Sequence, residues 1–200
     1  LAMAQLRGAD LAGFMRRRED EGVGANTIRL DLAVISRLYN VARTDWGMEG
    51  LRNPVENVTR PKVPPGRERR LEDGEEERLL EAANEQFRPV VRFALATGMR
   101  RAEIADLTWK YVNFKNRTAF LPRTKNGTAR TVPLSSRALD VLRSLPRNIS
   151  GSVFGYRPDS ITAAMVEACT KAGIEDLHFH DLRHEATSRF FEDTDMDSME

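Results

Sequence analysis

Residues whose side chains can do chemistry gather in three separate stretches of the 200-residue sequence: 97–103 (TGMRRAE), 124–127 (TKNG) and 180–184 (HDLRH). The first and third stretches contain arginines, the second a lysine, and the third two histidines. Arginine stays charged and donates paired hydrogen bonds in one plane. Two arginines from different elements can therefore clamp both oxygens of a phosphodiester as it gains negative charge in a transition state. The residue types thus fit chemistry at a phosphate group.

The order and spacing of these stretches resemble the motifs of the tyrosine recombinase (phage integrase) family. TGMRRAE resembles the TG-x-R-x-x-E box of the family, TKNG followed by RTVPL resembles its hairpin lysine and third strand, and HDLRH resembles its H-x-L-R-H box. NPVENVTRPK is similar to the linker common in the family, so the resemblance covers nearly the whole chain.

Roles for individual residues follow from this resemblance. Arg100 and Arg183 are expected to clamp the scissile phosphate, and Lys125 resembles the general acid that protonates the departing 5′-oxygen. His180 can exchange a proton with the nucleophile or donate to a phosphate oxygen, because the ordinary pKa of histidine is about 6.5. Glu103 lies three residues beyond Arg100, on the same helical face, and is expected to orient the site.

The nucleophile of such an enzyme is a tyrosine that follows the H-x-L-R-H box. The resemblance implies that this tyrosine becomes linked to the 3′-phosphate of one DNA strand, which is then religated to another duplex without a cofactor. In the family, a second His or Trp also follows the box, before the tyrosine. Neither residue occurs after the box in this sequence, because Tyr39, Tyr111 and Tyr156 all precede it. We therefore expect that the sequence stops before the nucleophile, and that these residues bind DNA without cleaving it.

Three other readings remain open. A non-catalytic DNA-binding regulator on the same scaffold would explain the basic residues but not their order. A metal-dependent nuclease would need ligands, and the histidines His178, His180 and His184 have no matching Cys or His partners elsewhere, so we expect no metal and no other cofactor. A type IB topoisomerase shares the chemistry, but the linker and N-terminal module favour the recombinase.

Charge is strongly segregated along the chain, although the net charge is only +1. Residues 86–137 have a net charge of +9, whereas residues 71–85 contribute −6 and residues 191–200 contribute −5. A basic middle of this kind fits a nucleic-acid partner, but a solvated face of mixed charge would explain the same residues. The resemblance implies that the partner is double-stranded DNA. The family works as tetramers on paired sites, so a homo-oligomer is expected for the full-length protein.

The pattern of the C-terminal part predicts a mainly α domain with a small three-stranded antiparallel sheet. Asp73 and Glu76 form a capping-box-like start for a helix over 75–83, and Pro89 opens a second helix that ends at Gly98. A short helix over 101–109 is followed by strands at 111–114, 118–122 and 129–134, which places Lys125 at the tip of the second hairpin. Further helices are expected from Ser135 or Ser136 to 145, from Asp159 or Ser160 to 172, and over 181–192.

The N-terminal part predicts a small all-α domain. Helices are expected over 9–21 and 27–44, the second with Ile28, Leu32, Ile35 and either Leu38 or Tyr39 at helical spacing. We assign residues 1–59 to this DNA-binding module, 60–70 to a basic linker and 71–200 to the catalytic domain. Candidate DNA contacts are Asn26, Thr27, Arg29, Arg37, Arg60, Lys62, Arg101 and Arg123.

The expected cellular compartment is inferred from two observations, the lack of a long apolar stretch and the presence of a single cysteine. No stretch approaches the roughly 20 apolar residues of a membrane span. Cys169 cannot form an internal disulfide and sits in an apolar helical pattern, which favours buried packing over reactivity. We therefore expect a cytoplasmic protein, associated with the nucleoid of a bacterium or phage, with no membrane partner.

Overall fold

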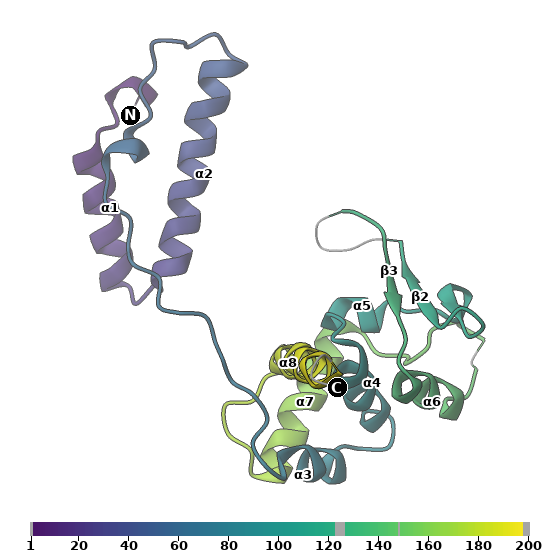
Figure 1. Cartoon of the computed structure of the whole chain (residues 1–200). Coiled ribbons are helices and arrows are strands. Elements are labelled where there is room, and N and C mark those ends of the chain that lie inside the picture. The colour runs from purple at the N-terminus through teal and green to yellow at the C-terminus, as the bar shows by residue number, and fades with distance from the viewer. Residues whose placement is uncertain (1, 123–126, 148, 198–200) are drawn as a thin grey trace. The chain divides into compact units, whose positions relative to one another are not determined.

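The structure, a computed structural model, describes residues 2–122, 127–147 and 149–197, with side chains described up to residue 192. The chain forms two compact units, Leu1–Gly66 and Arg67–Glu200 (Figure 1). Within the described residues, no helix combines the length and the apolar content that a membrane span requires.

The first unit is a pair of helices closed by two short 3-10 turns. Its elements are η1 (Met3–Gln5), α1 (Gly8–Asp20), α2 (Ala25–Thr44) and η2 (Pro54–Asn57). Leu11 of α1, Leu32 of α2 and Val55 of η2 form the buried centre. Of the two residues left open by the sequence pattern, Tyr39 faces the interior and donates a hydrogen bond to the Met3 carbonyl (2.6 Å), whereas Leu38 is 43% exposed.

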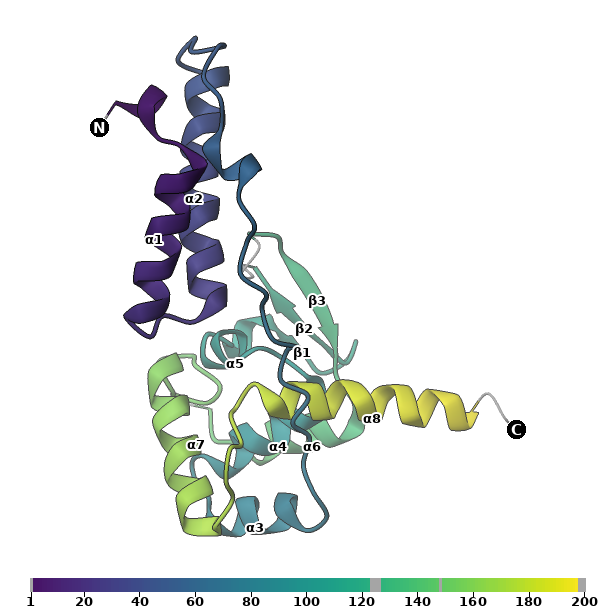
Figure 2. The same cartoon turned by 90° about the vertical axis from the view of Figure 1, so that its left-hand side faces the viewer.

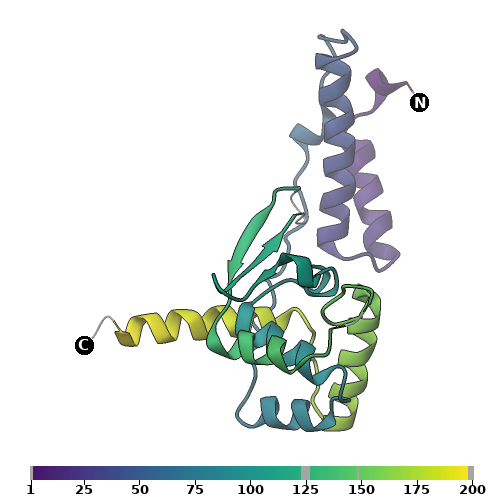
Figure 3. The same cartoon turned by 90° about the vertical axis from the view of Figure 1, so that its right-hand side faces the viewer.

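The second unit surrounds one buried helix. Its helices are α3 (Glu75–Ala82), α4 (Arg88–Thr97), α5 (Arg101–Ala105), α6 (Ser136–Ser144), α7 (Pro158–Ala172) and α8 (Asp181–Asp197), with η3 at Trp109–Tyr111. Helix α4 is apolar on most of its surface and packs against α6 and α8, while α3 packs against α7 (Figure 2). The C-terminal half of α8 extends past the packed body of the unit (Figure 3).

The predicted antiparallel sheet is confirmed, with strand order β1-β2-β3. The strands are β1 (Val112–Asn113), β2 (Thr118–Leu121) and β3 (Arg130–Pro133), and the longer pairing sets Leu121 opposite Arg130. Ala119 and Val132 pair across the sheet and are both buried, so this face packs on the core. Lys125 and Arg123 belong to the β2–β3 connection, but both lie outside the described residues.

Several helix ends differ from the sequence prediction, among them one end each of α3, α5 and α7. The N-cap of α3 is Gly74, not Asp73, because the chain enters the helix through a left-handed residue (φ 77°), and no side chain caps the helix. Helix α7 begins at Pro158 with Arg157 as N-cap, one residue before Asp159, because proline is favoured in a first turn. Helix α5 ends at Ala105, well short of the predicted residue 109.

Two other local predictions are confirmed. Ser135 caps α6, since its hydroxyl accepts a hydrogen bond from the Ala138 amide (3.2 Å). Cys169 is buried in α7 at 6% exposure, and burial raises the pKa of its thiol.

Candidate active site

Arg100 occupies the turn between α4 and α5. Gly98 ends α4 in the left-handed region (φ 58°), which reverses the chain and makes Arg100 the N-cap of α5. The Glu103 carboxylate then accepts from the Arg100 amide (2.9 Å) and from its Nη1 (3.1 Å). Because Glu103 is only 6% exposed, this pair fixes the backbone and the guanidinium of Arg100 together.

Arg130 of β3 is a third arginine at this position, and the sequence analysis did not single it out. Its Nη2 donates to the second oxygen of Glu103 (2.7 Å). Its Nε is buried and has no hydrogen-bond partner in the part of the chain that the structure describes. A signal for Arg130 was present: it stands two residues before Val132, and side chains at this spacing in a strand share a face. Val132 is buried, so Arg130 lies on the inward face, where an arginine needs a carboxylate.

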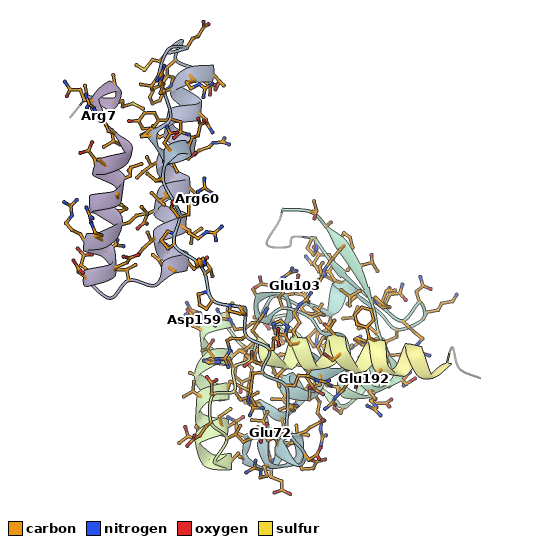
Figure 4. All side chains as sticks on the ribbon, turned by 60° about the vertical axis from the view of Figure 1, so that its left-hand side comes forward. Arg7, Arg60, Glu72, Glu103, Asp159 and Glu192 are labelled. Atoms are coloured by element: carbon orange, nitrogen blue, oxygen red, sulfur yellow. The ribbon has the colours of Figure 1, made fainter. Side chains whose placement is uncertain are left out.

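Arg183 reaches the same place from α8. Its Nη1 donates to the Gly98 carbonyl, so the turn that positions Arg100 also holds Arg183. Burial lowers the pKa of Arg183, and the neighbouring Arg100 and Arg130 lower it further. Arginine nevertheless stays protonated in proteins, so three like charges meet here. Glu103, labelled in Figure 4, is the one carboxylate that pairs with any of them among the described residues.

His180 stands directly before α8, one turn from His184, with the two rings 5.0 Å apart between centroids. Burial lowers the pKa of His180 from its ordinary 6.5, and the charges of His184 and Arg183 lower it further, while Asp181 opposes the shift. The His180 imidazole is therefore mostly neutral at neutral pH. A neutral imidazole can both accept and donate a proton.

The sequence-predicted residues thus divide into three groups. Arg100, Glu103, His180 and Arg183 come together at the meeting point of α5, β3 and α8. Arg101 instead donates to the Thr162 hydroxyl of α7. The remaining candidates that the structure describes are exposed, four at α2 of the first unit and two after η2: Asn26, Thr27, Arg29, Arg37, Arg60 and Lys62.

No metal centre is evident around the histidines. Within the described residues, no three His, Cys, Asp or Glu side chains are grouped closely enough to hold a metal ion. His178 instead donates its backbone amide to the Asp181 carboxylate (2.8 Å).

Comparison with known proteins places this geometry in a family. The sequence model of the phage integrase family matches residues 69–199, and the chain belongs to that family. The shufflon-specific DNA recombinase of Escherichia coli is 45% identical over 186 residues, which cover 92% of this chain and 48% of that protein. The integrase of Salmonella phage P22 is 33% identical over 172 residues, covering 76% of this chain and 44% of that protein. The chain therefore spans about half the length of these relatives.

Solved structures agree on the fold. A lambda integrase (residues 75–356) dimer bound to a COC′ core site superimposes with a TM-score of 0.72 at 18% identity, covering 91% of this chain and 72% of that one. A lambda integrase tetramer bound to a Holliday junction gives a TM-score of 0.73 at 17% identity, covering 92% and 59%.

Proposed function

We propose that these residues form the DNA-binding module and most of the catalytic module of a site-specific recombinase that cuts and rejoins DNA through a 3′-phosphotyrosyl intermediate. The observation that carries the proposal is the convergence of Arg100, Arg130 and Arg183 from three elements around one carboxylate, Glu103, which pairs with the first two. Three guanidiniums and one carboxylate leave a positive excess, and a phosphodiester with its growing transition-state charge balances it.

Each residue has a distinct task in the proposed mechanism. Arg100 and Arg183 bind the non-bridging oxygens, and their fixed positions mean that little reorganisation is needed as charge develops. His180, in its neutral form, takes the proton of the attacking hydroxyl or donates to a phosphate oxygen. Glu103 orients Arg100 through two hydrogen bonds. Lys125 is proposed as the acid for the 5′-oxygen from its place in the sequence alone.

The attacking tyrosine is proposed to follow α8. Tyr39 is buried in the first unit with its hydroxyl bound to a carbonyl, and the ring of Tyr111 packs against Phe120. The Tyr156 hydroxyl meets Asn84, and burial raises its pKa, which disfavours the nucleophilic phenolate. These 200 residues alone are expected to bind duplex DNA and form no covalent adduct.

Duplex DNA is the proposed partner, and the nucleoid of a bacterium or phage is the proposed place of action. The exposed polar and basic residues of α2 and of the segment after η2 are candidate contacts in the first unit. Assembly as a tetramer on paired sites is proposed for the full-length protein, by analogy with the lambda integrase tetramer on a Holliday junction.

A suicide DNA substrate tests the proposal. A longer polypeptide that continues to a tyrosine after α8 should form a covalent adduct with nicked duplex DNA. Arg100→Ala and Arg183→Ala should each slow adduct formation by about a hundredfold or more, because each removes a donor to the transition-state oxygens. Arg143→Ala is the matched control, since Arg143 is exposed and its ion pair among the described residues is with Asp140. Binding without any adduct would favour a regulator, and an adduct insensitive to both changes would refute these roles.

A further inference from the structure

Helix α8 carries two buried acids beside its proposed active-site residues. Asp181 (2% exposed) follows His180 directly, and Glu185 (3% exposed) lies two residues after Arg183. The two acids are four residues apart and so share one face of the helix. Buried carboxylates are costly unless they are paired, so their partners decide where α8 can sit.

The partner of Asp181 is Arg67, the first residue after the segment that joins the two units. Arg67 Nη2 donates to Asp181 Oδ2 (3.0 Å) and to the Asp176 carbonyl (2.6 Å), and its Nη1 pairs with the Asp176 carboxylate (2.8 Å). The planar guanidinium therefore ties the loop before His180 to the first residue of α8. Burial alone would raise the pKa of Asp181, but Arg67 and the His178 amide leave it lowered.

The partner of Glu185 from outside α8 is Arg70, of the same short stretch. Within α8, Arg189 Nε also donates to Glu185 Oε1 (2.7 Å). Arg70 Nε donates to Glu185 Oε2 (3.0 Å), and the Leu71 amide reaches the same oxygen (3.3 Å). Arg70 Nη1 continues along α8 to Glu192 (2.7 Å), which is labelled in Figure 4. Arg69, which lies between Arg67 and Arg70 in the sequence, binds both oxygens of a third buried acid, Glu75 of α3 (2.6 and 2.8 Å). Three arginines within four residues thus meet three buried carboxylates.

We propose that Arg67 and Arg70 are positioning residues for the active site: they fix the start and first turns of α8, so that His180 and Arg183 hold their places around the phosphate. The proposal rests on the proposed function. The proposal means that the residues directly after the segment joining the two units take part in shaping the active site. Arg67 and Arg70 contact α8, the helix that carries Arg183.

A double-mutant cycle on DNA affinity separates positioning from direct contact. In the 200-residue chain, Arg67→Gln should weaken binding to a duplex oligonucleotide about threefold or more, and this loss should vanish when Arg183→Gln is already present. Arg67→Lys should behave like Arg67→Gln, because it keeps the charge and loses the planar fork. Arg143→Gln makes the same charge change on α6 and serves as the control. Its effect on DNA affinity should be the same with and without Arg183→Gln, so the coupling energy between these two substitutions should be zero. A loss that persists in the Arg183→Gln background and is rescued by lysine would overturn the proposal.

Histidine NMR supplies a readout that does not depend on DNA. The chain has three histidines, so the ring signals of His180 and His184 can be assigned by substitution. Arg67→Gln and Arg70→Gln should shift or broaden both signals, and unchanged signals would overturn the proposal. If the wild-type chain fails to bind DNA while the signals respond, the proposed function fails and the positioning role stands.

A variant that misfolds still gives an answer. Asp181→Asn removes the buried charge that Arg67 compensates, so Arg67→Gln combined with Asp181→Asn should fold better than Arg67→Gln alone. No recovery in the double variant would show that Arg67 stabilises the unit without acting through α8, and would overturn the proposal.

Discussion

Glu103, the carboxylate beside three arginines, is the residue whose substitution best tests whether these arginines form an anion-binding site. Glu103→Gln keeps the shape of the side chain but leaves the positive charges of Arg100 and Arg130 uncompensated. We expect the free energy of unfolding to fall by about 2 kcal/mol, and sulfate or phosphate to restore part of it by replacing the lost negative charge. Thermal unfolding with and without the anion measures both effects.

Asp140→Asn is the control for this substitution, since Asp140 is exposed and, within the part of the chain that the structure describes, its ion pair is with Arg143. It should change the unfolding free energy by about 0.5 kcal/mol or less, with no special response to sulfate. If Glu103→Gln is equally harmless, the arginines do not form a concentrated anion site.

The pKa of His180 makes a second residue-scale prediction. Because its folded-state pKa lies below the ordinary 6.5, the unfolded chain binds this proton more readily. The stabilising contribution of neutral His180 is therefore complete above pH 6.5 and is lost as the pH falls from 6.5 through the folded pKa. His180→Gln should flatten that part of the stability profile, measured by denaturation at a series of pH values.

NMR titration checks the same shift directly. The His180 ring should titrate below pH 6.5 in the free chain, and its midpoint should rise when DNA binds, because a phosphate neutralises the adjacent guanidiniums. A midpoint at or above 6.5 in the free chain would contradict the environment described for this histidine.

At the scale of elements, the turn that ends α4 connects two of the arginines. Gly98 adopts a positive φ, and its carbonyl receives Arg183. Gly98→Ala should cost about 1 kcal/mol of stability for the strained backbone. It should also weaken DNA binding, since a shift of the strained turn moves the backbone carbonyl to which Arg183 donates. Denaturation and a DNA titration measure the two effects.

Gly151→Ala is the matched control, because Gly151 also has a positive φ (74°) and an added Cβ would meet open space. It should show the stability cost alone. Equal losses of DNA affinity in both variants would mean that the α4 turn has no particular role in holding Arg183.

The elements themselves could largely be predicted from the sequence, because they depend on local periodicity. Arg100, Glu103, His180 and Arg183 were found because they stand in motifs with a fixed spacing. Arg130, Asp181 and Glu185 were missed because their significance is a matter of three-dimensional pairing. A charged residue within a helix such as α8 reads as a surface residue until its burial is known. The choice between Leu38 and Tyr39 likewise depended on what packs against α2.

At the scale of the whole molecule, Arg67, Arg69 and Arg70 determine the first residue that a stable fragment of the second unit must include. A fragment of residues 67–200 should fold as this unit does. One that starts at residue 71, as the sequence-based domain boundary would have it, loses an arginine partner of each of three buried carboxylates. We expect its unfolding midpoint to be lower by about 5 °C or more. Calorimetry of the two fragments measures the difference, and equal midpoints would contradict the pairing described here.

These three arginines also set a rule for exchanging modules between relatives. A chimaera that takes its first module from another family member should be joined at Gly66, so that each buried acid keeps the arginine with which it is paired. A junction a few residues later would bring in foreign side chains at positions 67, 69 and 70, and α8 would be misaligned although neither module's interior had changed. Arg67 and Arg70 thus belong by sequence to a linker and by contact to the helix of the proposed active site, whereas Arg69 belongs by contact to α3.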